Sequence, residues 1–110
     1  MLHKYFLPPR VNNCLVTLGR NINEARRRRR TTMAIMAERA GISRITLGKI
    51  ERGDASVSMG AYASVLYALG MESQLGKLGD APSDLVGIDL ESMRLPKRIR
   101  MPKNRDPFHA

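Results

Sequence analysis

Two short helical segments joined by a glycine-containing turn place the strongest constraint on the fold of this 110-residue chain. The segments span residues 33–40 and 44–52, and both carry apolar side chains at helical spacing. Each segment follows a residue that can cap a helix N-terminus and precedes a glycine: Thr32 and Gly41 for the first, Ser43 and Gly53 for the second. Because the connection is so short, we expect the two helices to pack together, with Leu47 and Ile50 facing inward.

Helical spacing of apolar residues predicts three more helices around this pair. Before it, a helix of about residues 14–29 carries on one face Leu15, Leu18, Ile22 and Ala25. After it, a helix capped by Ser58 and ended by Gly70 directs inward Met59, Tyr62, Val65, Leu66 and Leu69, and a short helix near residues 73–78 uses Leu75 and Leu78. No alternating strand pattern occurs before residue 85, so the expected fold class is all-α with five helices.

The chain divides by composition into three parts. We expect an N-terminal arm of residues 1–13, a helical domain of residues 14–80 and an extended, basic C-terminal tail of residues 81–110. A proline pair without helical period marks the arm, and three prolines among basic residues exclude a continuous helix from the end of the tail. Residues 86–93 fit either a helical turn or a short strand.

The net charge of +9 is concentrated at the two ends of the chain. Residues 1–30 contribute +7, residues 31–93 contribute −3 and residues 94–110 contribute +5. This distribution suits a polyanionic partner, but charge runs also serve solubility alone, and charge by itself does not decide between the two. The run Arg26–Arg30 is open to the same two interpretations.

Nothing in the sequence indicates catalysis, a metal site or a cofactor. His3 and His109 lie near the ends of the chain, and Cys14 has no evident histidine partner. A single cysteine excludes an internal disulfide, and no apolar stretch is long enough for a membrane span or a secretion signal. We therefore expect a cytoplasmic protein that is not an enzyme.

The paired helices indicate DNA recognition. Two short helices joined by a tight turn form the helix-turn-helix, in which the second helix enters the major groove. The small side chain of Ala37 lets the two helix backbones approach each other. The stretches MAERAGIS, IERG and ALG resemble the Xre, or lambda-repressor-like, helix-turn-helix family over about residues 15–78. This resemblance implies a five-helix, lambda-repressor-like DNA-binding domain.

The resemblance also implies a role for each exposed position around the second helix. The positions that match base readers are Arg44, Ile45 and Lys49. The positions that match phosphate contacts are Ser43, Thr46 and Arg52. Arg44 and Lys49 suit guanine, and Ile45 suits a thymine methyl group. A solvated helix surface is the alternative at each position, and it is weak at Ile45 because an exposed β-branched residue there needs a reason.

Other positions support the fold or depart from the family. Glu51 resembles a structural acid that pairs with an arginine of the first helix, here Arg26. Met33 stands in the expected DNA interface where the family has a glutamine that clamps phosphate. Gly48 costs about 1 kcal/mol in helix propensity, and it either permits close approach to DNA or only weakens the helix. The apolar residues 33–35 form either a protein contact site or an ordinary scatter of surface side chains.

A single short helix reads few base pairs, so we expect a homodimer on an inverted repeat in double-stranded DNA. The stretch MGAYASVLYALGMES and the basic LPKRIR tail look like antitoxins encoded beside HipA-type kinase toxins. That resemblance implies an autorepressor of a type II toxin-antitoxin operon, with residues from about 85 onward contacting a second copy or the toxin. One alternative is a stand-alone Xre-type transcriptional repressor without a toxin. Another is a non-specific nucleic-acid-binding protein, against which the few aromatic residues argue.

Overall fold

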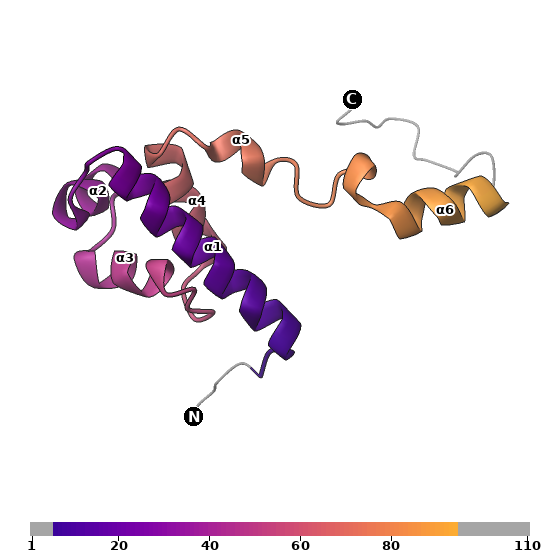
Figure 1. The fold of residues 1–110 in the computed structure, drawn as a ribbon, viewed down its shortest axis with the longest axis horizontal. Helices are drawn as coiled ribbons and strands as arrows, with labels where there is room; N and C mark the ends of the chain where they lie inside the picture. The colour runs from indigo at the N-terminus through magenta and orange to yellow at the C-terminus, as the bar shows by residue number, and fades with distance from the viewer. Residues whose placement is uncertain (1–5, 95–110) are drawn as a thin grey trace, which may run out of the picture. The chain divides into compact units, whose positions relative to one another are not determined.

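The computed structural model describes residues 6–94, except for the side chain of Arg94, and every regular element in that range is helical. The elements are α1 (Pro9–Arg28), α2 (Met33–Ala40), α3 (Arg44–Glu51), α4 (Met59–Ala68), α5 (Glu72–Leu75), the 3₁₀ helix η1 (Ala81–Ser83) and α6 (Leu85–Arg94) (Figure 1). The predicted all-α class is confirmed for this part of the chain. Within the described residues, two compact units are present: one ends at Gly76 and contains α1–α5, and the other begins at Lys77 and contains η1 and α6.

The core of the first unit is mostly aliphatic, with Tyr62 as its aromatic member, and is built by α1–α4. The long helix α1 packs against α3, and α2 packs against both α3 and α4 (Figure 1). The largest fully buried side chains are Ile22, Met36, Leu47, Ile50 and Val65. Burial of an aliphatic side chain of this size stabilises a fold by about 1.5–3 kcal/mol. The inward directions predicted for Leu47 and Ile50 are confirmed, and these two residues anchor α3.

Hydroxyl caps begin α2, α3 and α4, as predicted. The oxygen atoms of the three caps accept hydrogen bonds from the backbone three residues later, Thr32 from Ile35 N at 3.2 Å, Ser43 from Thr46 N at 3.0 Å and Ser58 from Ala61 N at 3.1 Å. Each bond satisfies an N–H group that has no partner inside its helix, which is worth about 1 kcal/mol. The three caps therefore fix where each helix starts.

The helices α1–α4 end in the same hydrogen-bonded turn, with one residue in the left-handed backbone conformation. In chain order this residue is Arg30, Gly41, Gly53 and Gly70, with φ between 52° and 78°. After α1, for example, the N–H of Thr31 returns to the carbonyl of Arg26 at 3.3 Å. Because a left-handed arginine costs about 1 kcal/mol or more, the end of α1 depends on tertiary contacts more than the glycine-ended helices do.

The start of α1 corrects the predicted N-terminal arm. The helix begins at Pro9, so the prediction of an arm over residues 1–13 is wrong for residues 9–13. Proline is favoured at the first position of a helix, because its fixed φ suits the helix and its missing N–H would have no partner there. Residues 1–5 of the predicted arm lie outside the described residues.

Two side chains predicted to face the core are exposed instead. Met59 is 69% exposed because it occupies the first position of α4, where the chain is only entering the helix. Leu78 is 68% exposed because α5 has already ended at Leu75. The helix predicted near residues 73–78 is therefore a single turn, and of its two expected core residues only Leu75 packs against the core.

The second unit contains a helix over residues 86–93, for which the sequence fitted either a helical turn or a short strand. Asp84 caps this helix, α6, by accepting a hydrogen bond from Gly87 N at 2.9 Å. The prediction of an extended tail is therefore wrong for residues 81–94, while residues 95–110 lie outside the described residues. The exposed apolar side chains of α6 are Leu85, Val86, Ile88, Leu90 and Met93.

Candidate nucleic-acid interface

α3 has two chemically different faces. Its inward face consists of Leu47 and Ile50, both fully buried. At 3.6 residues per turn, the opposite direction is shared by Ile45 and Arg52, which are two turns apart. Both side chains are exposed, and Ile45 is 74% exposed despite being apolar. The helix is thus held by its core residues and leaves its other face available to a partner.

The outward face of α3 is basic. Arg44 begins the helix, Lys49 lies in its last turn and Arg52 follows its end as the C-cap residue. The acidic residue of this helix, Glu51, forms an ion pair with a residue of α1 instead of facing solvent. The candidate base-reading and phosphate-contacting cations therefore lie on one side, without a neutralising acid from their own helix.

Asp54 lies just beyond this basic face and is held in a tight turn. Its Oδ1 accepts hydrogen bonds from the backbone N of Ser56 at 2.8 Å and from the Ser56 hydroxyl at 2.7 Å. These bonds hold the pKa of the Asp54 carboxyl below its ordinary value, and the charges of Lys49 and Arg52 lower it further. The hydroxyl of Tyr62, whose pKa is raised by burial, donates to the carbonyl oxygen of Asp54 at 2.8 Å. Asp54 is thereby held both by its own turn and by a hydrogen bond from α4.

The N-terminus of α3 carries two hydroxyl groups that are bonded to each other. Ser43 Oγ accepts from Thr46 N and donates to Thr46 Oγ1, with both distances 3.0 Å. In this arrangement the Thr46 hydroxyl keeps its own proton free for donation. Of the three candidate phosphate-contacting residues, the two with hydroxyl groups therefore lie at a helix N-terminus, where backbone N–H groups and the helix dipole favour an anion.

Met33 lies beside the middle of α3. It is half-buried at the start of α2 and packs against the core, and its terminal methyl group is 3.8 Å from the position that a Cβ would take at Gly48. Ala34 and Ile35, the other members of the expected apolar patch, are exposed. Met33 is therefore an apolar edge of the α3 surface and has no group with which to clamp a phosphate.

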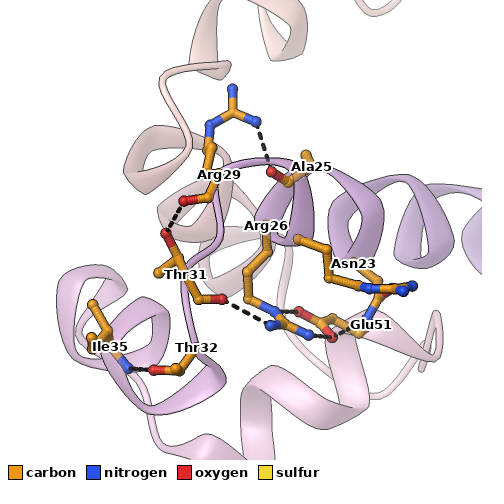
Figure 2. Close-up of polar contacts among 9 residues, drawn as sticks. Asn23, Ala25, Arg26, Arg29, Thr31, Thr32, Ile35 and Glu51 are labelled. Carbon is orange, nitrogen blue, oxygen red and sulfur yellow. Dashed lines mark hydrogen bonds and ion pairs between the residues drawn. The ribbon is translucent and has the colours of Figure 1, made fainter.

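Arg26 joins three parts of the fold through its guanidinium group (Figure 2). Its Nε and Nη2 donate to the two carboxylate oxygens of Glu51, at 2.7 and 3.1 Å. Its Nη1 donates to the carbonyl oxygen of Thr31, at 2.9 Å, in the turn between α1 and α2. The expected pair of Arg26 and Glu51 is thus present, and only 11% and 7% of the two side chains are exposed.

Asn23 is a third member of this cluster that sequence reasoning missed. Its Nδ2 donates to Glu51 Oε1 at 2.7 Å (Figure 2). Asn23 lies three residues before Arg26 on α1, so the two side chains share one side of the helix, and that spacing was the available signal. The Glu51 carboxylate therefore receives three hydrogen bonds, which offset the cost of burying its charge.

Two glycines allow α1 to lie directly against the end of α3. A Cβ at Gly19 would stand 2.5 Å from the carbonyl oxygen of Ile50 and 2.8 Å from that of Glu51. A Cβ at Gly53 would meet the backbone of Leu15 on α1, and Gly53 also has the positive φ described above. No side chain fits between the two backbones at these points, and sequence reasoning missed the part played by Gly19.

The other arginines of the run Arg26–Arg30 are exposed. Arg27 Nη1 donates to Asn23 Oδ1 at 3.4 Å, and Arg29 Nη1 donates to the carbonyl oxygen of Ala25 at 2.7 Å. The run therefore divides into one arginine that supports the fold and four that remain accessible to solvent.

The described part of the chain contains neither of two kinds of site, a metal-binding cluster or a membrane-spanning helix. Within residues 6–94, no three His, Cys, Asp or Glu side chains are grouped so as to hold a metal ion. None of the helices in this range combines the length and apolar character needed to cross a membrane. Cys14 is exposed on α1, and His3 and His109 lie outside the described residues.

Comparison with protein-family models, curated proteins and solved structures finds no match to this chain.

Proposed function

We propose that this protein is a sequence-specific DNA-binding transcriptional regulator that places α3 in the major groove of double-stranded DNA. The observation that carries the proposal is the contrast between the two faces of α3. Leu47 and Ile50 anchor the inward face, while the outward face combines exposed Ile45 with three cations. An α-helix fits the major groove, where base pairs present distinct patterns of hydrogen-bonding groups and methyl groups. The arrangement of α1–α5 is proposed to be lambda-repressor-like.

In this proposal the side chains around α3 divide into two roles. Arg44 and Lys49 donate hydrogen bonds to guanine, and Ile45 contacts a thymine methyl group. The groups proposed to contact phosphate are Ser43, Thr46 and Arg52. Met33 borders the interface but cannot make the polar contact that the family's glutamine makes.

Two copies of the chain would bind one DNA site. α3 has eight residues, so it reaches few base pairs, and a two-fold dimer on an inverted repeat doubles the sequence that is read. Neutralisation of phosphates by these cations also makes the affinity fall steeply as the salt concentration rises.

The test compares Arg44→Ala with Arg39→Ala, an exposed arginine near the end of α2 that is assigned no contact. A DNA site is first selected from random duplexes, and binding is then measured by fluorescence anisotropy on that site and on a scrambled duplex. We expect Arg44→Ala to lose about 10-fold or more in affinity, with weaker discrimination between the duplexes, because a bidentate arginine–guanine contact is worth about 1–3 kcal/mol. Arg39→Ala should bind within about 3-fold of the unmodified protein. If Arg44→Ala keeps both affinity and sequence preference, α3 is not the reading helix.

A second candidate function is that of an antitoxin that represses its own operon and binds a HipA-type kinase toxin. The observation that favours it is α6, where five apolar side chains are exposed over ten residues. Large apolar residues gathered in this way mark protein contacts more often than solvated surface. The alternative is a stand-alone Xre-type repressor, in which the tail adds only electrostatic affinity for DNA.

Pull-down of the full chain from its native cell, with mass spectrometry, separates these candidates. Recovery of a stoichiometric kinase-like partner supports the antitoxin proposal. If a chain that lacks residues 94–110 still recovers this partner, the partner binds outside those residues. Recovery of the chain alone, with specific DNA, favours the stand-alone repressor. Equal affinity for selected and scrambled duplexes favours instead a non-specific nucleic-acid-binding protein.

A further inference from the structure

Gly48 lies inside α3, and the folded protein offers no internal reason for a glycine there. A Cβ at this position would make ordinary van der Waals contacts, at 3.5 Å from Arg52 Nη1 and 3.8 Å from the methyl group of Met33. Both neighbours are the ends of flexible side chains. The backbone of Gly48 is also helical and is not among the positive-φ glycines. Alanine would therefore fit, and it would favour the helix.

Gly19 shows what an internal reason looks like. A Cβ there would stand 2.5 Å from a backbone carbonyl oxygen, so the packing of α1 on α3 requires the glycine. Nothing comparable surrounds Gly48. Only the ends of the Arg52 and Met33 side chains lie within 4 Å of its Cβ position, and Gly48 is itself half-buried.

Gly48 lies among the cations of α3. Ile45 and Arg44 lie one turn before it and Arg52 lies one turn after it, while the Met33 methyl group is 3.8 Å from the position that its Cβ would take. The side chains of these residues extend farther from the helix axis than the glycine Cα. A ligand that touches the backbone at this point must therefore enter between these side chains, and the cations favour a polyanion.

We propose that Gly48 is where the floor of the major groove lies against α3, so that base edges contact the helix backbone directly. This inference rests on the proposed DNA-binding function and adds the depth at which the helix is inserted. A helix with its side chains is about 10–12 Å across, and the major groove is about 12 Å wide. Because the fit is so close, a carbon atom about 1.5 Å from Cα, directed at the bases, changes how deeply the helix can enter.

The inference also explains why a residue unfavourable to helices occupies a position where alanine would fit. Ile45 can reach a thymine methyl group, and Arg44 can reach guanine, only if the helix approaches the base pairs closely. Gly48 is thus a positioning residue for its neighbours on the same face. The competing explanation is that Gly48 only weakens α3 and makes no difference to DNA binding.

The experiment compares Gly48→Ala and Gly48→Leu in the full chain with the control Gly76→Ala. Gly76 follows α5 with φ of −69°, and a Cβ there would be 3.6 Å from the carbonyl oxygen of Ser73, an ordinary contact. Thermal unfolding is measured by circular dichroism. Affinity is measured on a duplex selected with the unmodified protein and on a scrambled duplex of equal length and composition.

We expect Gly48→Ala to unfold at the same or a higher temperature and to bind the selected duplex about 10-fold more weakly, since discrimination at one base pair is worth roughly this factor or more. Gly48→Leu should lose more, the loss on scrambled DNA should be smaller for both variants, and Gly76→Ala should bind normally. Binding of Gly48→Ala within about 2-fold of the unmodified protein would overturn the inference while leaving the proposed function intact. An equal loss of affinity on both duplexes would show that Gly48 lies against the sugar–phosphate backbone, and it would overturn the proposed contact with base edges. If the unmodified protein itself fails to discriminate between the duplexes, the proposed function falls and the inference falls with it.

Discussion

The inward and outward sides of α3 differ in how much of the protein holds them. The inward side is fixed against its neighbours in three ways. Two aliphatic residues are buried, the backbones of α1 and α3 touch at Gly19 and Gly53, and Glu51 is hydrogen-bonded to α1. On the outward side, Ile45, Lys49 and Arg52 make no side-chain hydrogen bond or ion pair within the described part of the chain. The first side determines where α3 lies, and the second leaves its side chains free to bind.

This division separates variants that test the fold from variants that test binding. A change on the inward side should lower the free energy of unfolding and disturb DNA binding only through it. A change on the outward side should alter DNA binding at nearly constant stability. This division is contradicted if the inward variants remain as stable as the unmodified protein, or if the outward variants unfold it.

The largest effect is expected for Gly19→Ala. The added Cβ would collide with the carbonyl oxygens of Ile50 and Glu51, and a backbone cannot move aside as a side chain can. We expect the free energy of unfolding to fall by about 3 kcal/mol, the upper part of the range for overpacked sites. Urea unfolding followed by circular dichroism measures this change.

Gly60→Ala provides the matched control for that variant. Gly60 also lies in a helix, α4, but a Cβ there would meet only Ser58 Oγ, at 3.8 Å. Its stability should change by less than about 0.5 kcal/mol, or rise slightly because alanine favours the helix. Equal stability of Gly19→Ala and the unmodified protein would show that α1 can shift away from α3. That result would contradict the claim that the backbone contact at this position requires glycine.

Glu51→Gln should have the next largest effect. The substitution leaves the guanidinium group of Arg26 largely buried without its anionic partner, while one acceptor oxygen remains at position 51. We expect a loss of about 2 kcal/mol in the free energy of unfolding, below the 3–5 kcal/mol typical of fully buried pairs, because the pair is partly accessible to water. Chemical unfolding at neutral pH measures the loss.

Glu24→Gln tests whether that loss belongs to the cluster rather than to charge in general. Glu24 is an exposed acid on α1, and its removal should change stability by less than about 0.5 kcal/mol. If both glutamine variants lose the same amount, the contacts of Glu51 with Arg26 and Asn23 contribute little, and the rigid positioning of α3 has another origin.

On the inward side, the features that depend only on residues close in sequence could be predicted. The caps at Thr32 and Ser43 and the glycine ends of α2 and α3 depend on chemistry within a few residues, so they could be predicted from spacing. The pairing of Glu51 with Arg26 came only from a family resemblance. Asn23 was missed because its spacing to Arg26 shows only that the two side chains share one side of α1 and does not by itself identify a partner 28 positions away.

The remaining errors have identifiable physical causes. Gly19 carries no local sign that another backbone passes within contact distance. The sequence assigns Pro9 to an arm although proline favours the first turn of a helix. It leaves residues 86–93 open between helix and strand because the apolar residues 86, 88 and 90 alternate as in a strand, while 86, 90 and 93 share one helix face. For the candidate interface, sequence supplied the exposed residues of α3, but only the structure shows that alanine would fit at Gly48.

The smallest effect is expected for Asp54→Asn. This variant should distinguish the two sides of α3, because it should lower the stability of the fold while raising the affinity for DNA. Two hydrogen bonds from Ser56 hold the pKa of the Asp54 carboxyl below its ordinary value of 3.8, so the folded state favours the charged form. That contribution is present above about pH 4 and is lost as the pH falls through the lowered pKa. Asp54→Asn should therefore cost about 0.5 kcal/mol at neutral pH after discounting for solvent screening, and the difference should shrink in acid.

The same substitution removes a negative charge beside Lys49 and Arg52, so we expect DNA affinity to rise about 2-fold at low salt and to return to that of the unmodified protein at high salt. Ser56→Ala is the control, because it removes the hydroxyl hydrogen bond to Asp54 and keeps the charge. It should lower stability without raising affinity. If Asp54→Asn binds DNA less tightly than the unmodified protein, Asp54 positions the outward face, and the inward and outward sides of α3 are not independent.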